Sequence, residues 1–158
     1  MEFLGDYRFA ATALEVWIAL NDPEVLKRTI PGCETMVRIS ATEYAGHVSV
    51  KLGPLNAGFE GKITLSELDP PASYRISVEA EGTIAGRAAG SARVRLEDVP
   101  GGSIIHYQAE TEFGGRLATI GAKFVRGTAT RYADKFFARF AQAMAERSAA
   151  AAIAPPPP

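Results

Sequence analysis

The sequence has few of the residues that form disulfides and metal centres. Its 158 residues include one cysteine, Cys33, and two histidines, His47 and His106. A single cysteine excludes an intramolecular disulfide and any site built from several thiolates. Cys33 has no histidine in its motif, so we interpret it as a small apolar residue rather than a reactive thiol. We expect both histidines on the outer face of a sheet, and we predict neither a metal site nor a catalytic residue.

Excess charge and long apolar runs are also missing. Seventeen Lys and Arg against eighteen Asp and Glu give a net charge of −1, which argues against binding to nucleic acid phosphates. Residues 1–6 carry acids where a secretory signal needs basic residues. The longest apolar stretch, residues 148–154, is far shorter than the roughly 18 residues that suggest a membrane span. We therefore expect a cytoplasmic protein that can also lie peripherally at the inner face of the cell membrane.

The hydrophobic pattern predicts strands in the middle of the chain and helices near both ends. Residues 3–9 alternate as in a half-buried strand, and a capping box at Thr12 and Glu15 begins a short helix. Asp22 and Pro23 begin a second one. Five turn signals then divide residues 34–113 into six strands. Residues 116–147 return to helical spacing and carry seven bases against two acids.

This order predicts an α+β fold. A seven-stranded curved antiparallel sheet should wrap its apolar face around the long C-terminal helix, with two short helices between strands 1 and 2. Residues 1–147 should form one ligand-binding domain, and residues 148–158 an Ala/Pro-rich tail or linker. Phe137 falls outside both apolar faces of the long helix, so it is a candidate for contact with a membrane or a partner, the alternative being that it only covers the two short helices.

Many of the inner positions of the predicted sheet are small. They are Gly46, Gly61, Ala80, Ala88, Gly90, Ala92 and Ala109, with Gly121 on the helix opposite. Either large aromatic residues fill this space, or it stays open as an apolar cavity, and the composition by itself favours neither. Three inner tyrosines, Tyr44, Tyr74 and Tyr107, are expected to anchor a ligand carbonyl or a buried water.

Several motifs follow one another along the chain: Asn21–Leu26, Ile30–Glu34, Leu52–Pro54 with Gly58–Lys62, Leu68–Pro71 with Tyr74, and Ala88–Ala92 with Val94 and Leu96. In this order they resemble the CoxG family of carbon monoxide dehydrogenase accessory proteins. The family belongs to the helix-grip superfamily, also called SRPBCC or START-like, so the resemblance implies this fold with an apolar cavity. It also implies a non-enzymatic accessory protein that recruits a molybdenum hydroxylase of the carbon monoxide dehydrogenase type to the membrane, or brings it a quinone.

The resemblance and the strand phases together define a candidate site. The expected ligand is an apolar small molecule or lipid, such as menaquinone or ubiquinone, with no covalently bound cofactor. The expected ligand-binding residues are Trp17, Phe59, Gly61, Ile63, Ile76, Val78, Gly90, Ala92, Tyr107, Ala109, Leu117, Ile120, Gly121 and Phe124, and the expected cavity mouth is Leu55, Ile84, Arg87 and Arg116. The alternatives are a structural recruiter with a filled core and a helix-grip enzyme of the cyclase or hydratase type.

Overall fold

The structure, a computed structural model, describes residues 1–52, 55–82, 86–115, 118 and 121–153. Its strands are β1 (Glu2–Phe9), β2 (Cys33–Ser40), β3 (Glu43–Leu52), β4 (Leu55–Asp69), β5 (Ser73–Gly82), β6 (Gly86–Val99) and β7 (Gly102–Gly114). Its helices are α1 (Ala13–Leu20), α2 (Pro23–Thr29) and α4 (Ala122–Ile153). This order of elements confirms the predicted fold class.

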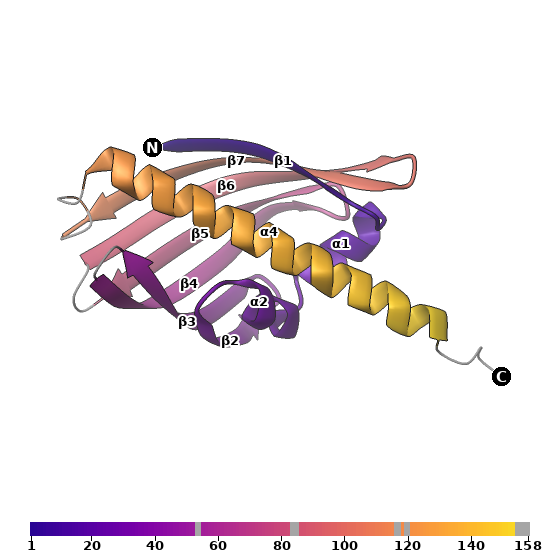
Figure 1. Cartoon of the computed structure of the whole chain (residues 1–158), viewed down its shortest axis with the longest axis horizontal. Coiled ribbons are helices and arrows are strands. Elements are labelled where there is room, and N and C mark those ends of the chain that lie inside the picture. The colour runs from indigo at the N-terminus through magenta and orange to yellow at the C-terminus, as the bar shows by residue number, and fades with distance from the viewer. Residues whose placement is uncertain (53–54, 83–85, 116–117, 119–120, 154–158) are drawn as a thin grey trace.

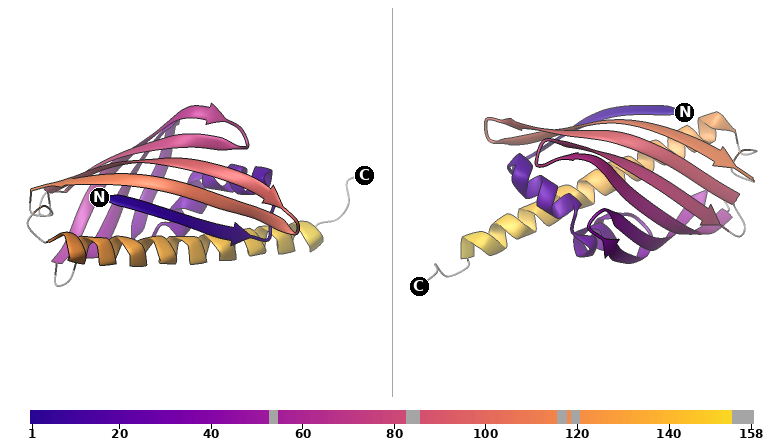
Figure 2. Two further views of the ribbon diagram at one scale, coloured as in Figure 1. Left: turned by 90° about the horizontal axis from the view of Figure 1, so that it is seen from above. Right: turned by 180° about the vertical axis from the view of Figure 1, so that it is seen from behind.

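All seven strands join one antiparallel sheet in the order β1-β7-β6-β5-β4-β3-β2. Strands β2 to β7 follow one another as a meander, and β1 pairs with β7 at the far edge. The sheet curves around α4, which crosses its concave face from one end to the other (Figures 1 and 2). Side chains alternate along each strand, so the concave face receives the apolar positions predicted from the sequence.

Both short helices begin where the sequence predicts. The Glu15 amide donates to Thr12 Oγ1 at 3.2 Å, and the Thr12 amide donates to Glu15 Oε2 at 3.4 Å, which completes the capping box. Pro23 occupies the first turn of α2, and the Glu24 amide donates to Asp22 Oδ1 at 3.0 Å. These two helices close one end of the concave face, beneath the C-terminal part of α4 (Figure 2).

Helix α4 differs from the prediction at both ends. It begins at Ala122 rather than near Arg116, because Gly121 has φ +103°, outside the helical range of L-residues. It also continues to Ile153, so residues 148–153 of the predicted tail extend the helix. Alanine has the highest helix propensity, and four of these six residues are alanine. No helix in the described part of the chain combines the length and the apolarity that crossing a bilayer requires.

Aromatic side chains fill the end of the concave face nearest α1 and α2. The ring of Phe137 stacks on Tyr7 at 5.2 Å and on Tyr107 at 5.4 Å, while Phe140 meets Phe9 edge-on at 5.2 Å. We call these five residues the aromatic core. Phe137 is only 9% exposed, so its predicted contact with a membrane or partner is wrong: β1 lies over α4 and covers the side of the helix that carries it.

Candidate functional site

An apolar cavity of about 230 Å³ lies on the concave face, away from the aromatic core. Strands β5, β6 and β7 line it with Ile76, Val78, Ala80, Ala88, Ala89, Gly90, Ser91, Ala92, Ala109, Glu110, Thr111 and Phe113. Five of the predicted ligand-binding residues therefore meet in one cavity: Ile76, Val78, Gly90, Ala92 and Ala109. Whether they bind a ligand stays a prediction.

The register of the three strands explains why this space is open. Three rows of residues cross the floor of the cavity: Ile76–Ala92–Ala109, Val78–Gly90–Thr111 and Ala80–Ala88–Phe113. We call these nine residues the small-residue floor. Two of the rows contain one large apolar side chain and two alanines, and the middle row has Gly90 between Val78 and Thr111, so little side-chain volume rises above the floor. Ala80, Ala88, Thr111 and Phe113 were not in the predicted site, although all four follow the same alternation as residues that were.

Phe59 lies at one end of the small-residue floor. It is 7% exposed and forms a second buried cluster with Ala57, against which Ala80, Ala88 and Phe113 pack. Because these three residues also line the cavity, Phe59 packs beside it without being one of the lining residues. Its contact with a ligand stays a prediction.

Four other predicted ligand contacts are not among the residues that line this cavity. Trp17 meets Tyr74 edge-on at 4.8 Å, Ile63 packs against the main core, and Tyr107 stacks on Phe137. Gly61 has only backbone oxygens near its Cα, at 3.8 and 3.9 Å from a Cβ built there. Strand phase places Ile63, Tyr107 and Gly61 on the concave face, but it does not show how far the aromatic core extends along that face.

The helix side of the predicted site is only partly described. Phe124 is 41% exposed and is not among the residues that line the cavity, so its contact with a ligand stays a prediction. Gly121 precedes α4 instead of lying within it, and a Cβ built there has no atom within 4 Å. Leu117 and Ile120 lie outside the described residues. Arg126 lies over the ring of Phe3 at 5.0 Å, which links the first turns of α4 to the edge strand β1.

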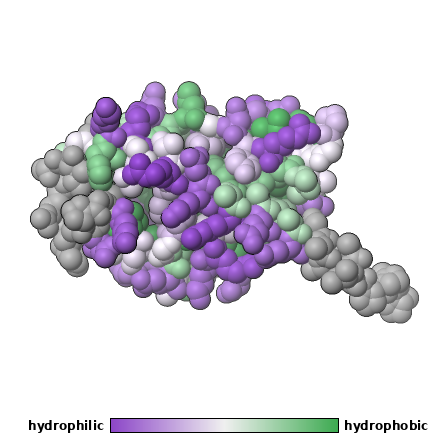
Figure 3. Space-filling view, in the orientation of Figure 1, coloured by the Kyte–Doolittle hydropathy of each residue, from purple (hydrophilic) through white to green (hydrophobic). Residues whose placement is uncertain are grey.

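The strand ends that flank the predicted mouth gather at one end of the sheet, beside the first turn of α4 (Figure 1). Arg87 is exposed there and extends across Gly114, where its Nε would lie 2.9 Å from an added Cβ. Ile84 and Arg116 lie outside the described residues, and only the backbone of Leu55 is described. Figure 3 shows the α4 side of the molecule as mostly hydrophilic, with scattered apolar patches.

Two tyrosine hydroxyls donate hydrogen bonds within the protein. Tyr44 Oη donates to the Asn21 carbonyl at 2.8 Å, and Tyr132 Oη donates to the Pro31 carbonyl at 2.7 Å. Tyr44 therefore caps the end of α1 rather than anchoring a ligand carbonyl, which corrects the expectation from the sequence. Burial raises the pKa of Tyr74 and Tyr132, so both phenols stay neutral.

Both histidines lie on the convex face, as predicted, and each contacts two carboxylates. His106 Nδ1 lies 2.5 Å from Asp6 Oδ1, and His106 Nε2 lies 2.9 Å from Glu97 Oε2. His47 Nδ1 lies 2.6 Å from Glu60 Oε1. The second acid beside His47 is Glu34, at 3.7 Å. Within the described ranges, no group of His, Cys, Asp and Glu residues is arranged to hold a metal ion. Burial raises the pKa of the Cys33 thiol, and its Sγ donates to the Thr35 carbonyl at 3.2 Å.

A curved antiparallel sheet that wraps around one long helix, with an apolar cavity on its concave face, defines a protein of the helix-grip class. The chain belongs to the carbon monoxide dehydrogenase CoxG family, whose model matches residues 5–145. This membership confirms the resemblance seen in the sequence motifs. It places the chain in a family of accessory subunits associated with carbon monoxide dehydrogenase.

Solved structures support the fold. A conserved protein from Geobacillus kaustophilus aligns with a TM-score of 0.86 at 24% identity, over 92% of this chain and 96% of that one. An uncharacterised protein from Rhizobium leguminosarum aligns with a TM-score of 0.71 at 14% identity, over 92% and 95%. A protein from Thermus thermophilus aligns with a TM-score of 0.70 at 12% identity, over 94% and 99%. No curated protein sequence matches the chain.

Proposed function

We propose that this protein is a non-enzymatic accessory protein that holds the ring of a quinone or similar lipid in the cavity and delivers it to a carbon monoxide dehydrogenase-type molybdenum hydroxylase at the membrane. The observation that carries the proposal is the apolar cavity above the small-residue floor. Its large apolar side chains, such as Ile76, Val78 and Phe113, present only carbon atoms to a ligand. Such a surface favours an apolar group over a charged substrate.

The volume of the cavity limits the size of the bound group. Apolar cavities of about 150 Å³ bind benzene, whereas drug-sized ligands occupy about 300–1,000 Å³. At about 230 Å³, this cavity suits a small ring and not a whole isoprenoid lipid. A lipid tail would therefore leave along the first turns of α4, where the exposed ring of Phe124 offers an apolar surface.

The chemistry of the cavity wall supports binding rather than catalysis. Glu110 is the one ionisable residue among the described residues that line it. Its neighbours in the sequence, Ala109 and Thr111, belong to the floor, so the Glu110 side chain lies on the convex face. General acid or base catalysis needs a titratable group within hydrogen-bond reach of the ligand, and the carbon-rich wall supplies none to the proposed ring.

The test compares a variant that fills the cavity with one that adds the same side chain elsewhere. Ala92→Leu adds volume above the floor, and Ala45→Leu adds it on the convex side of β3. The probe is menadione, a quinone ring without a tail, measured by calorimetry and by thermal shift. We expect menadione to bind the parent protein and Ala45→Leu, and to bind Ala92→Leu about tenfold more weakly.

Stability distinguishes an open cavity from a filled core. If the core were filled, Ala92→Leu would overpack it at a cost of about 1–3 kcal/mol. Loss of stability with unchanged menadione binding would contradict the proposal and favour a structural recruiter. Organic extraction of protein purified from its source cell, followed by mass spectrometry, should also recover a ring-bearing apolar molecule.

Gly90 is a poorer position for this test than the sequence suggests. A Cβ built there lies 3.0 Å from the Glu110 carbonyl oxygen and 3.4 Å from Thr111 Cγ2. Because the carbonyl belongs to the sheet backbone, it cannot move aside easily. Gly90→Val would therefore disturb the strand pairing as well as the cavity, and Ala92→Leu gives the clearer result.

A further inference from the structure

The convex face of the sheet carries an arrangement of arginines that the cavity does not explain. Arg75 on β5 lies directly opposite Arg93 on β6, and Arg95 follows two residues later on the same face. Like charges directly opposite each other on neighbouring strands destabilise a sheet. Among the described residues, neither Arg75 nor Arg93 has a carboxylate partner within 4.0 Å.

The immediate neighbours of this pair are neutral and can form hydrogen bonds. On the flanking strands, Ser66 lies opposite Arg75, and Gln108 lies opposite Arg93. Along the strands, Ser73, Ser77 and Ser91 occupy adjacent positions on the same face. The one side-chain contact that this pair forms in the described structure is from Arg75 Nη2 to Ser91 Oγ, at 3.4 Å. The two guanidinium groups therefore remain available to an anion.

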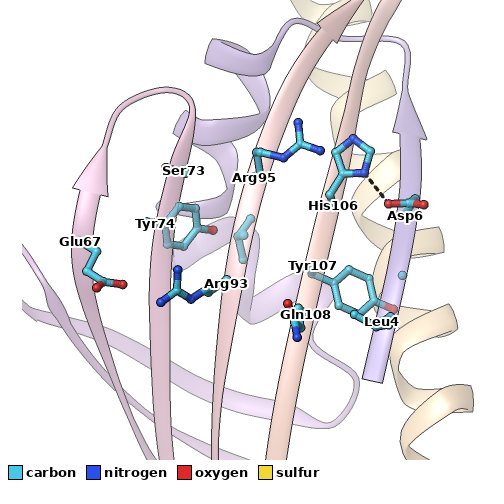
Figure 4. A pocket seen from close by; sticks show the side chains of 12 residues that line it. Leu4, Asp6, Glu67, Ser73, Tyr74, Arg93, Arg95, His106, Tyr107 and Gln108 are labelled. Atoms are coloured by element: carbon cyan, nitrogen blue, oxygen red, sulfur yellow. Dashed lines mark hydrogen bonds and ion pairs between the residues drawn. The ribbon is translucent and has the colours of Figure 1, made fainter. Parts of the chain in front are cut away.

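Arg93 and Arg95 also line a groove of about 770 Å³ on this face, which we call the outer groove. Figure 4 shows their side chains on β6, between Glu67 at one margin and the paired His106 and Asp6 at the other. The acids at the second margin, Asp6 and Glu97, both contact His106, and Glu97 Oε2 also lies 3.5 Å from Arg95 Nη1. The centre of the outer groove is therefore more positive than its margins.

The outer groove is wide enough for an extended polypeptide that runs along β6. It reaches from Glu67 on β4 to Leu4 on β1, and these four strand spacings of about 4.8 Å make it about 19 Å wide. Arg93 and Arg95 are two residues apart, a separation of about 6.7 Å along the strand. Alternate side chains of another extended segment have the same spacing. Leu4, which is 75% exposed, offers an apolar contact at the margin.

The geometry points to the outer groove as a docking site for an extended segment of a partner protein with acidic residues at alternate positions. Its carboxylates would contact Arg93 and, in exchange for the exposed ion pair with Glu97, Arg95, with Arg75 as a third cation. Guanidinium groups bind carboxylates through two parallel hydrogen bonds, which makes arginine well suited to this role. The site lies on the opposite face of the sheet from the cavity, so it does not depend on a ligand there.

Binding of two synthetic peptides tests this inference. The first has four Glu–Thr repeats and so presents acids at alternate positions, and the second has the same composition with its four acids in one block. Both carry fluorescein, and affinity is read from fluorescence anisotropy at low salt. We expect the alternating peptide to bind the tighter of the two, and its binding to weaken as salt screens the charges.

Three variants locate the interaction. Arg93→Glu should weaken binding of the alternating peptide about tenfold, since it replaces an attraction by a repulsion. Arg75→Gln should weaken it about threefold, because this residue lies at the side of the groove. Arg139→Glu makes the same charge change as Arg93→Glu on the exposed face of α4, and it should leave binding within about twofold of the parent protein.

Several outcomes would overturn the docking site. One is equal binding of the alternating peptide to Arg93→Glu and to the parent protein. Another is equal affinity for the two peptides, and a third is displacement of the alternating peptide by inorganic phosphate at equal concentration, which would indicate a small-anion site. Menadione binding to Arg93→Glu should equal that of the parent protein, so failure of the docking site can be told apart from failure of the cavity proposal.

Discussion

The two ends of the concave face are built from the same sheet and the same helix, yet they fill the space between them differently. At one end, the aromatic core places rings from β1, β7 and α4 in contact at 5.2–5.4 Å. At the other end, the small-residue floor leaves a cavity of about 230 Å³. The concave-face positions of β6 show this change from large to small residues. Leu96 and Val94 lie at the packed end, and Ala92, Gly90 and Ala88 follow at the cavity end.

This difference separates stability from binding. Burial of aromatic rings contributes most of the stabilisation that a core can supply, and the aromatic core lies where α1, α2 and α4 all meet the sheet. The floor contributes less, because small side chains bury little apolar area. The packed end can therefore keep the protein folded when the cavity is empty.

The largest effect should come from the packed end. Phe140 is 0% exposed and contacts both Phe9 and Phe136. Phe140→Ala should lower the free energy of unfolding by about 3–5 kcal/mol, because it leaves a cavity among rings that cannot close around it. Urea denaturation measures this loss. The matched control is Phe124→Ala, on the same helix but partly exposed, which should cost less than about 1 kcal/mol.

A pair of glycines on the concave face should give a smaller effect that sharpens the comparison. A Cβ added at Gly5 would overlap the ring of Tyr107, which is held by its stacking on Phe137. Gly5→Ala should therefore cost about 1–3 kcal/mol. At Gly61, the nearest atoms to an added Cβ are 3.8 Å away, so Gly61→Ala should be neutral or stabilise by up to about 1 kcal/mol. Equal losses in the two variants would contradict the idea that the ends differ in packing.

The smallest effect concerns how stability depends on pH through Glu97, on the convex face of the sheet. The hydrogen bond from His106 is the main cause that lowers the pKa of Glu97 below its ordinary value of 4.5. A carboxyl whose pKa is lower in the folded state stabilises the protein above that ordinary value, and the contribution is lost as the pH falls through the lowered pKa. Melting temperatures of the parent and Glu97→Gln should therefore differ at about pH 5.5 and converge towards about pH 3.

An exposed acid on the same convex face, but on the neighbouring strand β7, provides the control for this pH effect. Glu112 has no ion pair among the described residues, and it lies on the convex side of β7. Glu112→Gln should shift the melting temperature equally at both pH values. A difference between Glu97→Gln and the parent that persists at the lower pH would show that Glu97 acts through packing rather than through its charge.

The fold could be predicted from the sequence because local signals agreed with one another. The capping box at Thr12, the proline of α2 and the five turn signals each mark a boundary by backbone chemistry that does not depend on distant contacts. The start of α4 was missed because a glycine inside a helical pattern can either belong to the helix or interrupt it. The positive φ of Gly121 decides for interruption.

The site could be predicted only in part, because alternation shows which face a residue occupies but not what lies opposite. It placed Ile76, Ala92 and Ala109 on a common wall, and the strand register brings them side by side. It could not show that the ring of Tyr107 would stack on Phe137, since that contact joins residues thirty positions apart on different elements. The outer groove was missed because each arginine looks like an ordinary exposed residue until β5 and β6 are paired.

The hydrogen bond between Tyr132 and the Pro31 carbonyl divides α4 into two lengths. Beyond Tyr132, the helix is held by the aromatic core and by the ion pairs of Arg147 with Asp22 and of Glu146 with Arg28. Before it, ten residues from Ala122 span about 15 Å. A rotation of about 20° around Tyr132 would move the start of the helix by about 5 Å, roughly the width of one strand spacing. This first length of α4 is attached to β1 by Arg126 over the ring of Phe3, so a rotation about Tyr132 would have to break that contact.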